Sequence, residues 1–308
     1  MASTIQGAVA APGRAESGPR PGVLPTELLL LSMAVIWGVN FSVVKYGVGQ
    51  ISPLAYNGLR VAIAAVALLA VAALAVREPW PARRDVLRLL GLGVLGNCVY
   101  QIFFIEGIER TGAGTASLIL AASPAVIAVM GRVRGSEQIT RRGAAGIVLS
   151  IAGVGLVMLG TGTAAGQGSL TGDLLLFVGC VVWALFTVLL VPYTQRVDGV
   201  QLSALTMLGG ALPMALVAAP ELARVAWRDV TPGGWGAVAY SSLAALVVAY
   251  LIWYRGVRVI GPTRTALFGN LQPFIALLVA WLWFKEVPTA VQGVGAAAIT
   301  AGILLTRR

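Results

Sequence analysis

Residues 97–124, NCVYQIFFIEGIERTGAGTASLILAASP, recur in altered form as residues 246–273, LVVAYLIWYRGVRVIGPTRTALFGNLQP. A shift of 149 residues, from 107 to 256, places Gly107 on Gly256, and the same shift places Pro124 on Pro273. It continues without a gap, pairing Glu137 with Glu286, Gly146 with Gly295 and Gly153 with Gly302. Glycine and proline mark turns and kinks. Their agreement in a single register therefore predicts an internal duplication.

The composition is that of a membrane protein. The chain is 58% hydrophobic and only 11% charged, whereas soluble domains carry about 25% charged residues. Its solvent must therefore be largely the lipid bilayer. In a soluble protein the net charge of +10 would suggest nucleic acid, but no continuous basic stripe is present, and excess Arg on cytoplasmic loops orients membrane proteins. We expect no nucleic-acid partner.

The usual reactive side chains are scarce. Histidine is absent, which removes the commonest general base and metal ligand. Cys98 and Cys180 each stand alone in an apolar run, so neither a disulfide nor a metal site is expected. Nucleophilic or metal chemistry has few parts to work with. The sequence therefore predicts no metal, no cofactor and no enzyme.

The apolar pattern predicts an all-α integral membrane protein with ten transmembrane helices. The spans, each near the roughly 20 residues a bilayer needs, are 27–47, 53–76, 86–107, 112–132, 142–160, 172–191, 200–220, 233–255, 262–284 and 288–306. Residues 1–26 lack the apolar core of a signal peptide and are expected to form a disordered cytoplasmic tail. Residues 27–160 would form the first five-helix repeat and residues 161–306 the second.

The distribution of Lys and Arg predicts the orientation. If the N-terminus lies inside, most of these residues fall on the inner side, so both termini are predicted to be cytoplasmic. Five spans per repeat is an odd number, and the two repeats must then insert with opposite orientation. Inverted repeats are typical of secondary carriers, whose substrate site lies near the midplane between the halves.

Several short motifs carry a family resemblance. They are Trp37-Gly38-Val39-Asn40-Phe41, Ser52-Pro53 leading to Arg60, Thr111-Gly112-Ala113, Pro124, Glu137, Trp183-Ala184, Gly261-Pro262, Pro273, and Phe284-Lys285-Glu286 followed by Gly293. In this order the set resembles the drug/metabolite transporter superfamily, specifically its EamA-type exporters. The resemblance implies export of amino acids and related small metabolites across a bacterial inner membrane. The superfamily also contains nucleotide-sugar carriers and is related to small multidrug pumps.

The middle of every predicted span lacks Asp and Glu. An intramembrane carboxylate is the usual proton relay and the usual partner of a cationic substrate. Its absence disfavours a multidrug exporter of lipophilic cations and leaves facilitated diffusion open. A nucleotide sugar would need several deep cations for its phosphates, and only Arg60 qualifies clearly.

Aromatic and amide side chains are the candidates for substrate binding. Asn97, Tyr100 and Gln101 fall on one face of a helix with Phe104, and the repeat shift places Gln101 on Tyr250. A shift of 146, from 37 to 183, relates span 1 to span 6 in the same way. The predicted binding residues are Trp37, Asn40, Asn97, Tyr100, Gln101, Trp183, Thr187, Tyr250 and Trp253. The alternatives are interfacial aromatic belts and hydrogen bonds between helices.

Three further residues are predicted to act in structure or gating. Arg60 lies about 10 Å into span 2, at 1.5 Å per residue; it could meet a substrate carboxylate, but a structural role is favoured, bridging backbone carbonyls or Asn57. Pro124 and Pro273 interrupt spans 4 and 9 and could act as hinges. The glycine-rich spans 5 and 10 suit helix packing, either as a scaffold or as the face of a homodimer.

Together these features favour an alternating-access exporter of amino acids, aromatic ones included, and related small metabolites. The alternatives are a multidrug exporter, a nucleotide-sugar carrier and a non-transporting membrane scaffold.

Overall fold

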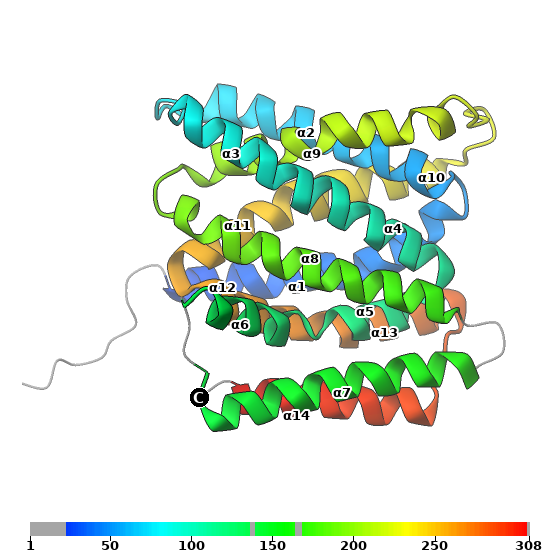
Figure 1. Cartoon of the computed structure of the whole chain (residues 1–308). Helices are drawn as coiled ribbons and strands as arrows, with labels where there is room; N and C mark the ends of the chain where they lie inside the picture. Colours follow the sequence, from blue (N-terminus) through cyan, green and yellow to red (C-terminus); the bar gives the residue numbers. More distant parts are fainter. Residues whose placement is uncertain (1–22, 136–138, 164–167, 307–308) are drawn as a thin grey trace, which may run out of the picture.

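The computed structural model describes residues 23–135, 139–163 and 168–306, and these are almost entirely helical (Figure 1). Of the predicted tail, residues 1–22 lie outside the described residues. Residues 23–26 open the first helix instead. Pro25 is no obstacle there, because the first turn of a helix makes no use of the missing N–H.

Within the described residues the helices follow one another without a strand between them. They are α1 (Val23–Val48), α2 (Pro53–Ala75), α3 (Arg83–Gly93), η1 (Val94–Val99), α4 (Tyr100–Arg110), α5 (Ala113–Leu120), α6 (Ser123–Val133), α7 (Arg141–Thr163), α8 (Leu170–Thr194), α9 (Gly199–Leu222), α10 (Pro232–Ala239), η2 (Tyr240–Val248), α11 (Ala249–Ile260), α12 (Pro262–Phe268), η3 (Gly269–Leu271), α13 (Gln272–Phe284) and α14 (Ala290–Thr306).

These helices join into ten apolar spans, as predicted. Within the described residues, nine are long and apolar enough to cross a membrane, and the apolar helix at 290–305 is shorter. The predicted ends differ from the observed ones by a few residues. Span 8, for example, was expected to end at residue 255, but α11 continues to Ile260. Arg255 and Arg258 end the apolar pattern there without ending the helix.

The packing relates the two halves to each other. Helix α2 packs along α9 and α7 along α14, so each of these pairs joins equivalent spans of the two repeats. Span 3 packs on span 6 through α4 and α8, and span 8 packs on span 1 through α11 and α1. Exchanging the halves leaves this pattern unchanged, which is the arrangement of two inverted five-helix repeats.

Helices α7 and α14 form a layer at the lower edge of the bundle in Figure 1. A methyl group added to Gly153 would lie 2.7 Å from the carbonyl oxygen of Gly295, and one added to Gly302 would clash with the carbonyl oxygen of Gly146. The 149-residue shift exchanges these two contacts, so the repeat axis passes between the helices. Small residues let helix backbones approach closely in lipid. These glycines therefore pack the two repeats together within one chain, which is the scaffold role.

Spans 3 and 8 each contain a π-helical segment, η1 and η2. The repeat shift places residues 94–99 on 243–248, inside η2. A π turn inserts an extra residue into the helix and is frequently found at functional sites. The matching segments change which side chains face the centre of the bundle.

Spans 4 and 9 are interrupted near their middles. Span 4 breaks at residues 121–122 between α5 and α6. Span 9 changes from the α-helix α12 to the 3-10 turn η3 before α13 begins. Pro124 and Pro273 occupy the first turn of the helix that follows each break, where proline is well tolerated. Both interruptions lie beside the centre of the bundle.

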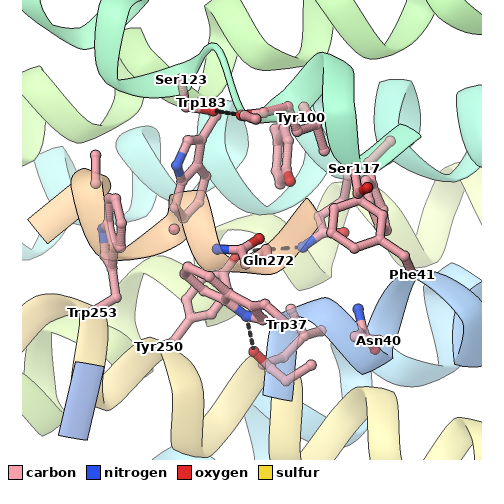
Figure 2. A pocket seen from close by; sticks show the side chains of 18 of the residues that line it. Trp37, Asn40, Phe41, Tyr100, Ser117, Ser123, Trp183, Tyr250, Trp253 and Gln272 are labelled. Carbon is pink, nitrogen blue, oxygen red and sulfur yellow. Dashed lines mark hydrogen bonds between the residues drawn. The ribbon is translucent and has the colours of Figure 1, made fainter. Parts of the chain in front are cut away.

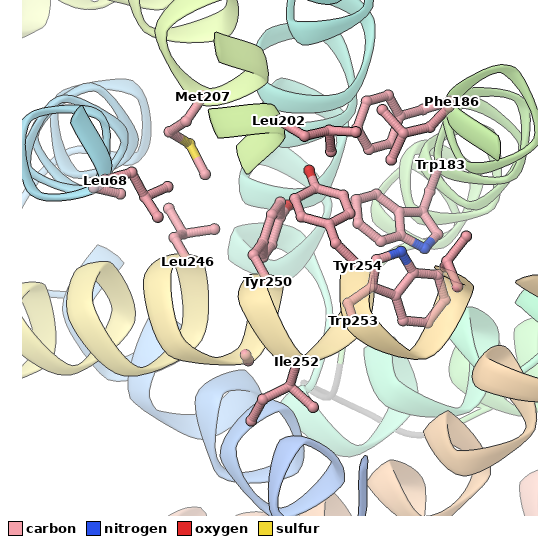
Figure 3. Packing of buried hydrophobic residues seen from close by; sticks show 14 of the residues in the cluster. Leu68, Trp183, Phe186, Leu202, Met207, Leu246, Tyr250, Ile252, Trp253 and Tyr254 are labelled. Carbon is pink, nitrogen blue, oxygen red and sulfur yellow. The ribbon is translucent and has the colours of Figure 1, made fainter. Parts of the chain in front are cut away.

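A cluster of buried side chains fills the space between α2, α8, α9 and α11 (Figure 3). Leu68, Met207 and Leu246 lie at one end of the view, and Trp183 and Trp253 face each other at the other end. Since lipid is as apolar as leucine, close packing rather than the hydrophobic effect holds such helices together. The aromatic end of this cluster borders the cavity described next.

Candidate functional site

A buried pocket of about 80 Å³ lies at the centre of the bundle. It is lined by α1, α2, α4, α8 and α11 and by both interrupted spans (Figure 2). Ligand pockets in proteins usually measure roughly 300–1,000 Å³. The cavity is therefore narrow in this conformation, and a substrate larger than a small amino acid requires the surrounding helices to move apart.

Seven aromatic side chains line the pocket, and five of them, from four helices, form one cluster of rings. Trp183 lies at their centre, with ring centroids 6.2 Å from Trp37, 5.0 Å from Tyr100, 5.6 Å from Tyr250 and 5.4 Å from Trp253. Figure 2 shows these rings turned toward a common space. The indole nitrogen of Trp37 donates to the carbonyl of Ala245 at 2.9 Å, which fixes its ring. The result is a rigid aromatic wall.

A chain of hydrogen bonds forms the polar side of the pocket. Arg60 Nη2 donates to Gln101 Oε1 at 3.3 Å, and Gln101 Nε2 donates to the Tyr250 hydroxyl, also at 3.3 Å. Gln101 and Tyr250 occupy equivalent positions in the two repeats. Their direct contact places the pocket on the axis that relates the repeats.

The lining is paired across this axis. The repeat shift relates Gln101 to Tyr250, Phe104 to Trp253, Ser117 to Ala266, Leu120 to Gly269, Ala121 to Asn270 and Ser123 to Gln272, and all of these line the pocket. Trp37 and Trp183 are paired by the shift of 146. A site on the axis of two inverted repeats is equally placed for access from either membrane face.

Several polar atoms around the pocket are buried and lack a hydrogen-bond partner among the described residues. They are Asn40 Oδ1, Arg60 Nε and Nη1, Trp253 Nε1, and both amide atoms of Asn270. Buried polar atoms are normally paired. Four side chains with unpaired polar atoms around one cavity indicate a site for a polar ligand.

No aspartate or glutamate is among the described residues that line this pocket. The cation of Arg60 is therefore the only formal charge in that lining.

The structure brings seven of the nine predicted binding residues together in this pocket, along with Arg60 and Pro124. Asn97, Thr187 and Pro273 lie outside it. Asn97 packs instead against Gly210 of α9. The prediction assumed α-helical spacing, but η1 spans 94–99 and turns Asn97 away from the face that carries Tyr100 and Gln101.

Thr187 is one turn further along α8 than Trp183 and is fully buried among the helices. The contacts of Arg60 also differ from the favoured prediction, in which Arg60 bridges backbone carbonyls or Asn57. The Nδ2 atom of Asn57 donates to the backbone oxygen of Gln101, so Asn57 and Arg60 contact Gln101 separately rather than each other.

Sequence reasoning missed the polar residues at the interrupted spans. Ser117, Ser123, Asn270 and Gln272 all line the pocket. A signal was available, because Ser123 and Gln272 directly precede the paired prolines. Backbone breaks in membrane helices occur where they line a cavity or are buried in protein.

A second cleft, of about 440 Å³, lies between the α1–α2 and α9–α10 connections. Its Glu221 accepts hydrogen bonds from the backbone nitrogens of Leu54, at 3.1 Å, and Ala55, at 3.3 Å, and so caps the start of α2. Arg224 and Asp229 complete its charged edge. Its Glu221 serves a helix end, and no aromatic side chain is among the described residues that line it.

Ten apolar helices in two inverted repeats around a central pocket are the architecture of a secondary membrane transporter. Comparison with known families is consistent with this class. The model of the EamA-like transporter family matches residues 24–159 and matches again at residues 170–308. The chain belongs to the EamA-like transporter family, a multi-pass membrane protein family, and the resemblance stated from the sequence is confirmed.

The relatives are transporters by name. The chain is 28% identical over 289 residues to the uncharacterized transporter YyaM of Bacillus subtilis, covering 90% of this chain and 92% of YyaM. It is 26% identical over 280 residues to a probable terminal-alkyne amino-acid exporter of Streptantibioticus cattleyicolor, covering 91% and 92%. A solved crystal structure superposes with a TM-score of 0.68 at 18% identity, covering 92% of this chain and 96% of that one. That last similarity concerns the fold alone.

Proposed function

We propose that this protein exports amino acids, aromatic ones included, and related small metabolites across the bacterial cytoplasmic membrane by alternating access. The observation that carries the proposal is the aromatic pocket on the repeat axis, with Gln101 and Asn40 among its walls. Aromatic walls with a few well-placed polar groups suit a small molecule that has an apolar side chain and a polar head. The probable amino-acid exporter among the relatives supports the same substrate class.

The lining also bears on coupling and on the competing substrates. Proton antiport normally uses a carboxylate within the membrane, and no Asp or Glu is found among the described lining residues. We therefore propose facilitated diffusion down the substrate gradient. The cation of Arg60 disfavours lipophilic cations. A nucleotide sugar would call for more than one such cation.

Movement of the interrupted spans would open the pocket to one side and then the other. The breaks before Pro124 and Pro273 line the cavity or adjoin it, and a break frees backbone groups to change their hydrogen bonds. We propose that these breaks act as paired hinges. Structures trapped open to each side should show different bends at the two positions, and superimposable spans 4 and 9 would remove the hinge from the account.

The test of the function is radiolabelled flux into proteoliposomes. Tryptophan, phenylalanine, threonine and a quaternary ammonium dye are compared with and without a pH gradient. We expect saturable amino-acid flux without a gradient. Trp183→Ala should abolish this flux, because that ring contacts four other aromatic side chains of the pocket lining.

The matched control is Trp281→Ala, since Trp281 is 52% exposed on the outside of the bundle. That variant should keep the flux. Dye flux that requires the gradient would replace the amino-acid exporter with a multidrug exporter, and absence of any flux would favour a membrane scaffold.

The orientation and assembly belong to the same proposal. Reporters that work only in the cytoplasm should be active at both termini, in agreement with the positive-inside bias of the sequence. We also keep the homodimer as a proposal, which light scattering of the purified protein would test. A monomer would leave the transport scheme intact, because the pocket is formed within one chain.

A further inference from the structure

Arg60 is a buried cation at the wall of the central pocket. The residue is 2% exposed and lies in α2. Its Nη2 donates to Gln101, and its guanidinium carbon lies 5.7 Å from the centroid of the Phe104 ring. Nε and Nη1 are buried without a hydrogen-bond partner among the described residues. Each edge of the guanidinium pairs one N–H of Nη2 with the N–H of either Nε or Nη1. Nη2 has two hydrogens and donates to one acceptor, Gln101, so its second N–H and one unpaired neighbour still form a parallel pair of donors.

Over the residues that the structure describes, this cation also lacks a counter-charge. Among the ion pairs of the described residues, each joins groups at the ends of helices, and none includes Arg60. Arginine remains protonated in proteins, and an unpaired charge within a membrane protein is costly. If Arg60 served only the scaffold, carbonyls or carboxylates would be expected to accept hydrogen bonds from all of its N–H groups. The observed contacts occupy only some of these groups.

We propose that Arg60 binds the carboxylate of the transported substrate. The planar guanidinium presents parallel N–H groups that match the two oxygens of a carboxylate. A phosphate or phosphate diester is the weaker fit, because Arg60 is the only Lys or Arg in the described lining. The inference rests on the proposed function and narrows it to substrates that carry one carboxylate.

The remaining unpaired groups suit the other end of an amino acid. The side-chain oxygens of Asn40 and Asn270 are buried and have no partner within the part of the chain that the structure describes, so they can accept from an ammonium group. The faces of Trp37 and Trp183 can attract the same cation. The pocket then offers a donor fork for the carboxylate and acceptors with aromatic faces for the ammonium, without a carboxylate of its own.

The experiment compares tryptophan with tryptophan amide as competitors of radiolabelled tryptophan flux in proteoliposomes. The amide keeps the indole and the ammonium group and loses only the carboxylate charge. In the wild-type protein we expect the amide to compete at least about tenfold more weakly, the scale of a lost charge-assisted hydrogen bond. This arm requires no mutation, so it decides the matter even if a variant fails to fold.

The variants sharpen the result. In Arg60→Gln the half-saturation concentration for tryptophan flux should rise about tenfold to a hundredfold. Tryptophan and its amide should then compete equally well. Arg60→Lys, which keeps the charge without the fork, should recover part of the discrimination. Arg228→Gln, at an exposed position in the α9–α10 connection, is the matched control and should behave as the wild type does.

The outcomes separate this inference from the function it rests on. Equal competition by tryptophan and its amide in the wild-type protein, with tryptophan flux intact, would overturn the role of Arg60 and leave the exporter standing. The role of Arg60 would also be overturned if Arg60→Gln distinguished tryptophan from its amide as strongly as the wild-type protein does. Absence of flux for every amino acid would overturn the proposed function, and this proposal with it.

Discussion

The two repeats meet on their common axis in two places that differ in kind. Between α7 and α14 they meet through glycines that are the same in both halves, Gly146 and Gly153 in one and Gly295 and Gly302 in the other. At the pocket they meet through residues that differ, because Gln101 of the first half contacts Tyr250 at the equivalent position of the second.

The difference separates scaffold from site. Close contact of two backbones tolerates only small residues, so both copies keep glycine there. The pocket has the same helical frame, but its two halves supply different chemistry. The first half provides Arg60 and Gln101. In the second half, the turn of α9 that corresponds to Arg60, residues 206–209, carries no charge. The duplication thus provides a symmetric frame, and divergence within it provides an asymmetric site for an asymmetric substrate.

The largest effect is expected where the scaffold contact is broken. In Gly153→Val the new side chain would begin 2.7 Å from the Gly295 oxygen, and backbones cannot yield as side chains do. We expect a loss of about 3 kcal/mol in the free energy of unfolding, measured by thermal unfolding in detergent. Gly155→Val is the control, because nothing lies within 4 Å of a methyl group at that position. Equal melting temperatures for the two variants would contradict the packing described for this layer.

A smaller effect is expected on substrate affinity in Gln101→Leu. The leucine cannot accept from Arg60 or donate to Tyr250, so the polar side of the pocket loses both of its bonds. The half-saturation concentration for tryptophan flux should rise about tenfold, the equivalent of about 1.4 kcal/mol. The exposed Gln195, which donates to the Arg258 carbonyl, gives the control Gln195→Leu. An unchanged half-saturation concentration in Gln101→Leu would place the substrate elsewhere.

A still smaller change is expected in Tyr250→Phe. The ring and its aromatic contacts remain, and only the hydroxyl that accepts from Gln101 is lost. One neutral hydrogen bond is worth about 1 kcal/mol, so the half-saturation concentration should rise about fivefold. Tyr240→Phe, which removes a hydroxyl bonded to the Ile36 carbonyl outside the pocket, should leave that concentration unchanged. A larger effect in Tyr240→Phe than in Tyr250→Phe would contradict the assignment of Tyr250, rather than Tyr240, to the substrate site.

The smallest effect is expected in Asn97→Leu. The Asn97 amide is buried with neither atom paired among the described residues, and it packs toward α9 rather than the pocket. Replacing an unpaired buried amide with an apolar group of similar shape is nearly neutral or stabilising. Flux and melting temperature should both stay close to those of the wild type. A clear loss of substrate affinity would return Asn97 to the site.

The frame of this molecule could be predicted from its sequence because its signals are strong and local. Apolar spans, turn residues and the 149-residue register predict the ten spans and the resemblance to EamA-type exporters. That register aligned Gln101 with Tyr250, a shift of 146 aligned Trp37 with Trp183, and these residues do come together. These equivalent residues meet in the structure because the repeat constrains the geometry of both copies together.

The remaining details depended on features without a local signal. The apolar spacing of residues 94–99 does not distinguish a π turn from an α-helix, so Asn97 was assigned to the wrong face. Asn270 and Gln272 reach the pocket only because span 9 is interrupted at 269–271. The partner of Arg60 could not be read from spacing either, since it depends on how α2 packs against α4.

The central claim is that the substrate lies on the repeat axis, between the aromatic rings and Arg60. The most direct measurement is the anomalous scattering of bromine in crystals of the protein grown with 5-bromotryptophan. The account predicts one strong peak beside Trp183 and Tyr250. A peak in the cleft beside Glu221 and Asp229 instead, with the central pocket empty, would contradict it.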